Sequence, residues 1–126
     1  MMNDLIGLQY EWGASPDDGN GKSDCFQLSC AIRRRLGLKD YGPTFAWAYN
    51  EYKEDSFSAR LLLRWLRDYC NPTEFPEDGD VGMSIDKAAL ITIACHRLFC
   101  IAPMGRSVSI EYSEGALSCA YWFSPK

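Results

Sequence analysis

The sequence has 126 residues, of which 47% are hydrophobic and 24% are charged, as is typical of one globular domain. This composition excludes disordered, collagen-like and coiled-coil proteins. The net charge is −4, whereas a surface that follows nucleic-acid phosphates normally has a basic excess, so we expect no nucleic-acid partner. The longest apolar run, residues 88–95, is too short for the ~20 residues of a membrane span, so we expect no membrane association.

The cysteines and the N-terminus indicate free thiols. The cysteines lie at positions 25, 30, 70, 95, 100 and 119, with no CxxC pair and without the ligand spacing of a zinc finger. The N-terminal Met-Met-Asn-Asp has neither a basic region nor a long apolar run, so we expect no signal peptide and synthesis in the cytoplasm. We therefore expect every cysteine to be reduced, and neither a metal nor another cofactor.

The first half of the sequence predicts helices, because apolar residues recur at helical spacing between capping and breaking residues. The helices cover about residues 3–10, 24–36, 43–52 and 58–70, and a loop rich in Gly, Asp and Asn occupies residues 11–22. Ser23 or Asp24 caps the second helix, and Gly37 ends it. We expect the polar face of this helix, with Arg33 and Arg34, to lie in solvent.

The second half of the sequence predicts strands. They lie at residues 81–84, 89–95, 98–102, 108–112 and 119–123, which are rich in β-branched and aromatic residues. Gly105 and Gly115 mark turns between them. Helices followed by closely spaced strands favour a single α+β domain over residues 1–126, with N-terminal helices packed on one antiparallel sheet of about five strands.

Cys25 is the strongest candidate for a reactive residue. It follows the Ser23-Asp24 cap and therefore lies in the first turn of the second helix. Unpaired amides and the helix dipole stabilise a thiolate at such a position, and the thiolate is the nucleophilic form of cysteine. A histidine on a neighbouring strand would complete the arrangement that papain-like enzymes use.

The residues around Cys25 resemble a known family. Residues 4–14 (DLIGLQYEWGA), the Gly- and Asp-rich loop and Asp24-Cys25 at a helix start together resemble the NlpC-type papain-like cysteine peptidases. Members of this family cut the stem peptides of bacterial peptidoglycan, and many are encoded by phages. Residues 79–81 (GDV) are similar to the Gly-Asp-Val that begins a strand of the family, and residues 120–125 resemble its closing strand. The resemblance implies a papain-like α+β fold.

The resemblance also implies roles for the matching residues. Cys25 would be the nucleophile, and Tyr10 and Asp24 would hold the free amine of the stem peptide's L-alanine, since a phenol and a carboxylate suit an ammonium group. Tyr10 as a core aromatic residue and Asp24 as a helix cap are the simpler interpretations. We expect Cys25 at the base of a surface cleft lined by Tyr10 and Asp24. The implied partner is a peptidoglycan stem peptide or a similar small peptide, reached by delivery to the cell wall or by association with a virion.

The sequence departs from the family pattern next to the nucleophile and at the base. Phe26-Gln27 stands where the family has Ser-Gly, which removes a polar substrate contact and adds a bulky ring. In the family, a histidine base begins the strand that follows the Gly-Asp-Val strand, and a third polar residue lies on the next strand. His96 is the only histidine of the chain that could be this base.

Two strand registers place His96 differently. In the first, residues 89–95 form the base strand, Ala89 takes the base position and Ile101 falls near the third position. His96 then lies at a hairpin tip, about 20 Å from the start of the strand at ~3.3 Å per residue. In the second register, His96 begins the base strand and Ser109 falls near the third position. We favour the first, because residues 89–95 are strand-like throughout.

The choice of register decides the expected function. The second register keeps a base and predicts an active cysteine peptidase or amidase. The first leaves Cys25 without a base and predicts a catalytically degenerate domain that retains a pocket, since loss of a general base alone costs about 10²–10⁴-fold in rate. One alternative is a non-catalytic binding or virion-assembly protein that uses the same cleft. Another is a structural domain in which Cys25 is a core residue.

Overall fold

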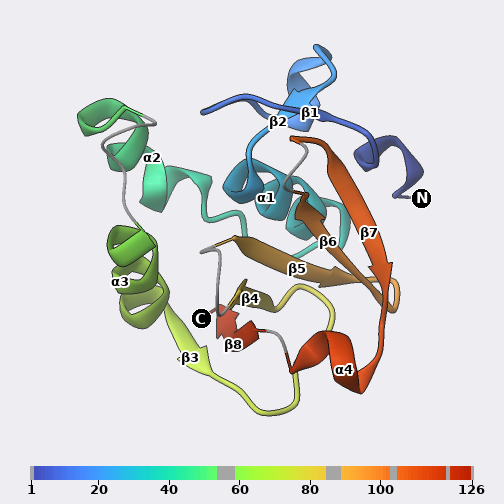
Figure 1. Cartoon of the computed structure of the whole chain (residues 1–126). Coiled ribbons are helices and arrows are strands. Elements are labelled where there is room, and N and C mark those ends of the chain that lie inside the picture. The colour runs from blue at the N-terminus through green and yellow to red at the C-terminus, as the bar shows by residue number, and fades with distance from the viewer. Residues whose placement is uncertain (1, 54–58, 85–88, 103–104, 119, 126) are drawn as a thin grey trace.

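The computed structural model describes residues 2–53, 59–84, 89–102, 105–118 and 120–125. Within them the chain is an α+β fold with a six-stranded antiparallel sheet and a small parallel sheet (Figure 1). The helices are α1 (Cys25–Arg35), α2 (Gly42–Glu51), α3 (Ala59–Tyr69) and α4 (Glu114–Leu117). The large sheet has the order β3 (Cys70–Pro72), β8 (Ala120–Pro125), β4 (Val81–Ser84), β5 (Leu90–Ala94), β6 (Arg97–Ile101), β7 (Ser107–Glu111).

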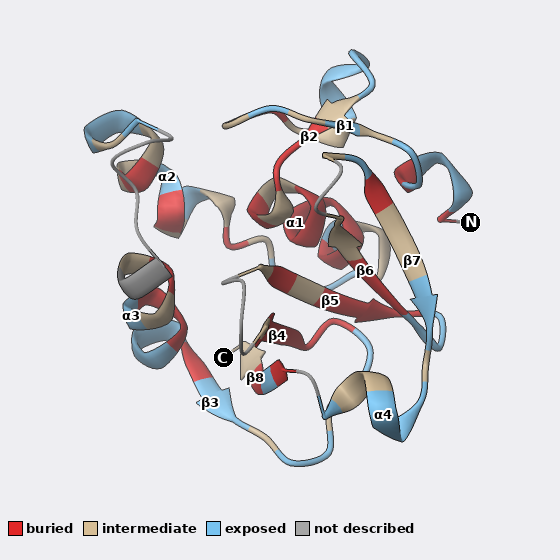
Figure 2. Ribbon diagram, viewed as in Figure 1, coloured by how far each residue is buried: buried red, intermediate tan, exposed pale blue. Residues whose placement is uncertain are grey.

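The two faces of the large sheet are covered by different helices. Helices α1, α2 and α3 pack on one face, where Phe26, Phe45 and Trp65 share a core cluster with Leu90. Helix α4 packs against the opposite face, next to Ile93. Leu90 and Ile93 serve different faces because side chains alternate along a strand. Figure 2 shows the buried residues gathered on α1, β4 and β5, at the centre of the molecule.

The N-terminal segment does not form the helix that was expected over residues 3–10. Only a 3₁₀ turn, η1 (Asn3–Leu5), is present, and it is followed by Gly7 at φ +86°. After this glycine the chain is extended, and β1 (Gln9–Tyr10) pairs in parallel with β2 (Lys22–Ser23). Hydrogen bonds to backbone groups elsewhere in the chain therefore stabilise this segment more than its local helical preference does. The loop between β1 and β2 holds a second 3₁₀ turn, η2 (Pro16–Asp18).

Helix α1 confirms the predicted cap, but its polar face is not all in solvent. The Asp24 side chain accepts a hydrogen bond from the Gln27 N–H and caps the helix. Arg33 is buried, contrary to expectation, because its guanidinium donates to the carbonyl oxygens of Lys39 at 2.9 Å and Gly79 at 2.7 Å. These bonds replace the water that the buried charge loses.

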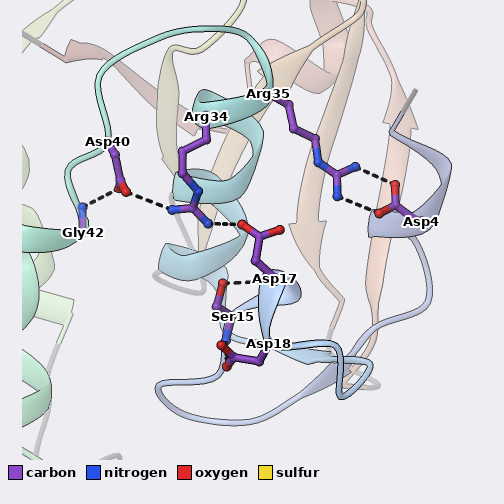
Figure 3. A network of polar contacts seen from close by, with 8 residues as sticks. All are labelled: Asp4, Ser15, Asp17, Asp18, Arg34, Arg35, Asp40 and Gly42. Atoms are coloured by element: carbon purple, nitrogen blue, oxygen red, sulfur yellow. Dashed lines mark hydrogen bonds and ion pairs between the residues drawn. The ribbon is translucent and has the colours of Figure 1, made fainter.

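The other two arginines at the end of α1 form ion pairs (Figure 3). Arg34 lies between the carboxylates of Asp17 and Asp40. Arg35 donates two hydrogen bonds to Asp4, at 2.5 and 2.6 Å, and so joins η1 to the last turn of α1. The hydrogen bond from Arg35 lowers the pKa of Asp4.

Two boundaries in the second half differ from the expected ones. The fourth helix was expected to reach residue 70, but α3 ends at Tyr69 and Cys70 begins the edge strand β3, which pairs with β8. The large sheet therefore has six strands instead of about five. Pro72 fits there because an edge strand can lack one amide donor. Gly115, expected in a turn, lies in α4, which the side chain of Ser113 caps.

The hairpin of β5 and β6 confirms the first register. Ala94 pairs with Arg97, and Cys95-His96 forms the two-residue turn between the strands. Cys95 and His96 have φ values of 52° and 61°, as in a type I′ hairpin turn. Cys95 and the other described cysteines are free thiols, as predicted, and Cys119 lies outside the described residues. Among the described residues, no helix has the length and apolar character needed to span a membrane.

Candidate functional site

The small parallel sheet brings the predicted site residues to one place. Tyr10 on β1 is the register partner of Ser23 on β2, and the Glu11 N–H donates to the Ser23 carbonyl at 3.1 Å. Ser23 is followed directly by Asp24 and Cys25, at the start of α1. Tyr10, Asp24 and Cys25 therefore come from adjacent segments, which residues 11–22 connect. The cleft expected at this point stays a prediction.

The carboxylate of Asp24 is enclosed by its own chain. Only 2% of Asp24 is exposed. One carboxylate oxygen accepts the Gln27 N–H at 2.7 Å, and the other accepts the Gly13 N–H at 2.8 Å and the Tyr49 O–H at 2.7 Å. Burial raises the pKa of Asp24, although these hydrogen bonds oppose the shift. This arrangement favours the helix-cap interpretation of Asp24 over the binding of a substrate amine.

Tyr49 of α2 is a site residue that the sequence did not single out. Its hydroxyl reaches Asp24, and its ring lies against Trp12 with a centroid separation of 4.8 Å. Gly13 adopts φ +81°, and a Cβ there would lie 3.6 Å from the Tyr49 ring. Burial and the charge of Asp24 raise the pKa of the Tyr49 hydroxyl. Little in the sequence indicated this role, because Tyr49 stands among other aromatic residues of α2, Phe45 and Trp47.

Cys25 is the first residue of α1, as predicted, but its surroundings do not favour a thiolate. The residue is half-buried and packs against the same aromatic core as Tyr49. Burial, followed by the negative charge of Asp24, raises the pKa of Cys25 to about 11. A hydrogen bond with the Leu90 backbone opposes this shift without reversing it. The amides of the helix N-terminus lower the thiol pKa as expected, but burial and Asp24 outweigh them and the net shift is upward.

His96 lies at the other end of the strand that Cys25 contacts. Leu90, against the Cys25 sulfur, begins β5, whereas His96 follows the end of β5. From Leu90 to Ala94 the strand is about 13 Å long at ~3.3 Å per residue, and the Cys95-His96 turn lies beyond its end. The imidazole is exposed and stacks on Tyr112 with a centroid distance of 4.4 Å. The structure thus brings Tyr10, Asp24 and Cys25 together but not His96.

Apolar residues occupy the positions where the resemblance places a base and a third polar group. Ala89 directly precedes β5, at the base position of the first register. Ile101, at the end of β6, packs against an apolar cluster that includes Leu28 and Phe99. Neither side chain can accept a proton from Cys25.

A scan against protein-family models found no match for this chain. Searches of curated proteins and of solved structures also found no significant match.

Proposed function

We propose that this chain is an NlpC-type papain-like domain that has lost hydrolysis and acts by binding. The placement of His96 carries the proposal, because the whole length of β5, about 13 Å at ~3.3 Å per residue, separates it from the end of β5 that Cys25 contacts. A working nucleophile and base need a hydrogen bond of about 3 Å. The chain has one histidine, so no second imidazole is present to take its place.

The order of the elements supports the family part of the proposal. A helix that begins with Cys25 precedes an antiparallel sheet, and β4 begins at Val81, after Gly79 and Asp80. The next strand, β5, then corresponds to the family's base strand, β6 to the strand of the third polar residue, and β8 to the closing strand. The positions of the scaffold are retained in this correspondence, whereas the reactive side chains of β5 and β6 are replaced.

The neutral form of the Cys25 thiol supports the proposed loss of hydrolysis. With a pKa of about 11, Cys25 is almost entirely neutral at pH 7, and a neutral thiol is a weak nucleophile. The proposed partner is a peptidoglycan stem peptide or a similar small peptide, bound near Tyr10 and Cys25. Because Asp24 is engaged within the chain, we expect its carboxylate to hold the site together, while the peptide contacts other groups. The setting we propose is a bacterial cell wall or a virion.

The test combines an activity assay with a binding assay. Peptidoglycan fragments with a free L-alanyl amine are incubated with the unmodified chain, Cys25→Ala and His96→Ala, and the products are followed by mass spectrometry. We expect no turnover in any of them. Turnover by the unmodified chain that vanishes in either variant would show an active peptidase and overturn the proposal.

Calorimetry with the same fragments tests the binding role. We expect equal affinity for the unmodified chain and Cys25→Ala, and weaker binding of a fragment whose alanyl amine is acetylated. Absence of binding by both fragments would contradict the peptide-binding role and favour a purely structural domain.

A further inference from the structure

A cavity lies between α2 and α3 and shares no residue with the Cys25 site. Its volume is about 370 Å³, and aromatic rings form much of its wall. The rings belong to Trp47 and Tyr52, near the end of α2, and to Trp65 and Tyr69 on α3. Figure 1 shows these two helices next to each other, at the side of the molecule that carries β3.

The aromatic rings of this cavity are held in place by one another. Trp47 and Tyr52 meet edge to face, with centroids 6.0 Å apart, and Trp65 and Tyr69 stack at 5.9 Å. Trp65 is 4% exposed and also contacts Phe45 in the core, which anchors this wall. Rings fixed in this way lose little further side-chain entropy when a ligand binds.

The cavity is lined by more acidic than basic residues. Glu51 and Asp68 contribute carboxylates and Arg64 contributes a guanidinium, and all three residues are exposed. None of the ion pairs in the part of the chain that the structure describes includes Glu51 or Asp68. Among the described residues, the cavity therefore has more carboxylates than guanidinium groups, and no ion pair to another element neutralises them.

The Trp65 indole N–H is buried and has no hydrogen-bond partner in the described residues. A buried donor without a partner costs free energy.

We propose that this cavity binds a small organic ammonium ion. Aromatic faces attract a cation through the ring quadrupole, and quaternary ammonium groups are bound by cages of such rings. The carboxylates of Glu51 and Asp68 add attraction at the rim, while an anionic ligand would meet a negative excess. The proposal is independent of the Cys25 site, because it uses none of the residues of that site.

Choline and 3,3-dimethylbutan-1-ol form a matched pair of probes, because they share shape and hydroxyl and differ in charge. Each is titrated into the ¹⁵N-labelled chain at constant ionic strength, and the indole N–H signals of Trp47 and Trp65 are followed by NMR. We expect choline to shift both signals and the neutral probe to bind about two- to thirtyfold more weakly. Equal affinities for the two probes, or no shift at either indole, would overturn the proposal.

Substitutions of three exposed residues test how much the charges contribute to choline binding. Glu51→Gln and Asp68→Asn should each weaken choline binding by about two- to fivefold, and Arg64→Gln should strengthen it by a similar factor. Thermal denaturation checks that each variant folds, which is expected at exposed positions. A choline affinity that is unchanged in all three folded variants would contradict the role of the carboxylates.

Discussion

Asp24 shows how one buried carboxylate can organise a site without reacting. It caps α1 through the Gln27 N–H, holds the loop through the Gly13 N–H, and reaches α2 through the Tyr49 hydroxyl. In each bond the carboxylate satisfies a partly buried donor that would otherwise lack an acceptor. The same residue also contributes to the raised pKa of Cys25. An acidic cap next to the cysteine therefore favours folding and disfavours a thiolate.

Replacing Asp24 tests its structural role. We expect Asp24→Ala to lower the free energy of unfolding by about 2–4 kcal/mol, because the cap is lost and the Gly13 N–H and Tyr49 O–H lose their acceptor. Urea denaturation measures the loss. Asp18→Ala, at an exposed position, is the control and should cost less than about 1 kcal/mol. Equal losses for the two variants would show that the buried hydrogen bonds of Asp24 contribute little.

The raised pKa of Cys25 predicts slow alkylation. With a pKa of about 11, the thiolate fraction at pH 7 is about one in ten thousand. We expect the rate of carbamidomethylation by iodoacetamide to keep rising with pH above 9, because ionisation of the thiol is incomplete there. Peptide mass spectrometry resolves the rate at Cys25 from that at Cys95, which is exposed at the hairpin turn and serves as the internal reference. A Cys25 rate that reaches its plateau below pH 8 would instead indicate an activated nucleophile.

At the scale of elements, α1 is joined to α2 and α3 by an aromatic side chain that the family pattern does not have. Phe26 is 4% exposed, and its ring lies 4.0 Å from that of Phe45 and 5.0 Å from that of Trp65, between centroids. The bulky ring at position 26 is therefore a core residue, and a serine there would lose this packing.

Placing the serine of the NlpC-type pattern at this position should therefore destabilise the protein. Phe26→Ser removes a buried ring and introduces a hydroxyl, and we expect the free energy of unfolding to fall by about 3–5 kcal/mol. Phe26→Leu keeps an apolar side chain and should cost about 1–2 kcal/mol. Both values come from urea denaturation followed by tryptophan fluorescence. Similar losses for the serine and leucine variants would mean that the ring itself fills no essential space.

We expect alanine substitutions of two glycines, in different elements, to change the stability of the protein in opposite directions. A Cβ at Gly82 on β4 would lie 2.8 Å from the ring of Trp122 on β8, so Gly82→Ala should cost about 1–3 kcal/mol. A Cβ at Gly115 in α4 would meet nothing within 4 Å, so Gly115→Ala should stabilise the protein by about 0.5–1 kcal/mol. Melting temperatures of the two variants measure the difference. A gain at Gly82 or a loss at Gly115 would contradict this description of the packing.

At the scale of the whole molecule, Ser107 joins the N-terminal segment to the far edge of the sheet. Its hydroxyl donates to the Leu5 carbonyl at 2.6 Å and accepts the Leu8 N–H at 2.8 Å, about a hundred residues away in sequence. The Asp4–Arg35 ion pair holds the same segment to α1. Residues 2–10 are thereby tied to both β7 and α1, which positions Tyr10 beside the start of α1.

Removing the Ser107 hydroxyl tests this connection. We expect Ser107→Ala to lower the free energy of unfolding by about 1–3 kcal/mol, because a buried donor and a buried acceptor lose their partners. Amide exchange of residues 2–10 should accelerate in the same variant, as seen by mass spectrometry. Ser109→Ala, whose hydroxyl accepts a hydrogen bond from Arg97 at an exposed position, is the control and should change stability by less than about 1 kcal/mol. Unchanged exchange in Ser107→Ala would show that other contacts hold the segment.

The sequence alone predicted the features that depend only on residues close together in the chain. The cap at Asp24, the end of the helix before Gly37 and the strand character of residues 90–94 depend on neighbouring residues, and the structure confirms each of them. The hairpin register followed from the same local pattern, and it placed His96 in a turn.

Tertiary contacts decided the remaining features, because their partners lie far apart in sequence. The pairing of β1 with β2 replaced an expected helix, pairing with β8 made a strand of residues 70–72, and the carbonyl of Gly79 allowed Arg33 to be buried. The protonation state of the Cys25 thiol was also decided by tertiary contacts. The helix amides that favour its thiolate are local, whereas the burial that raises its pKa comes from packing against α2, α3 and β5, and burial is the larger effect.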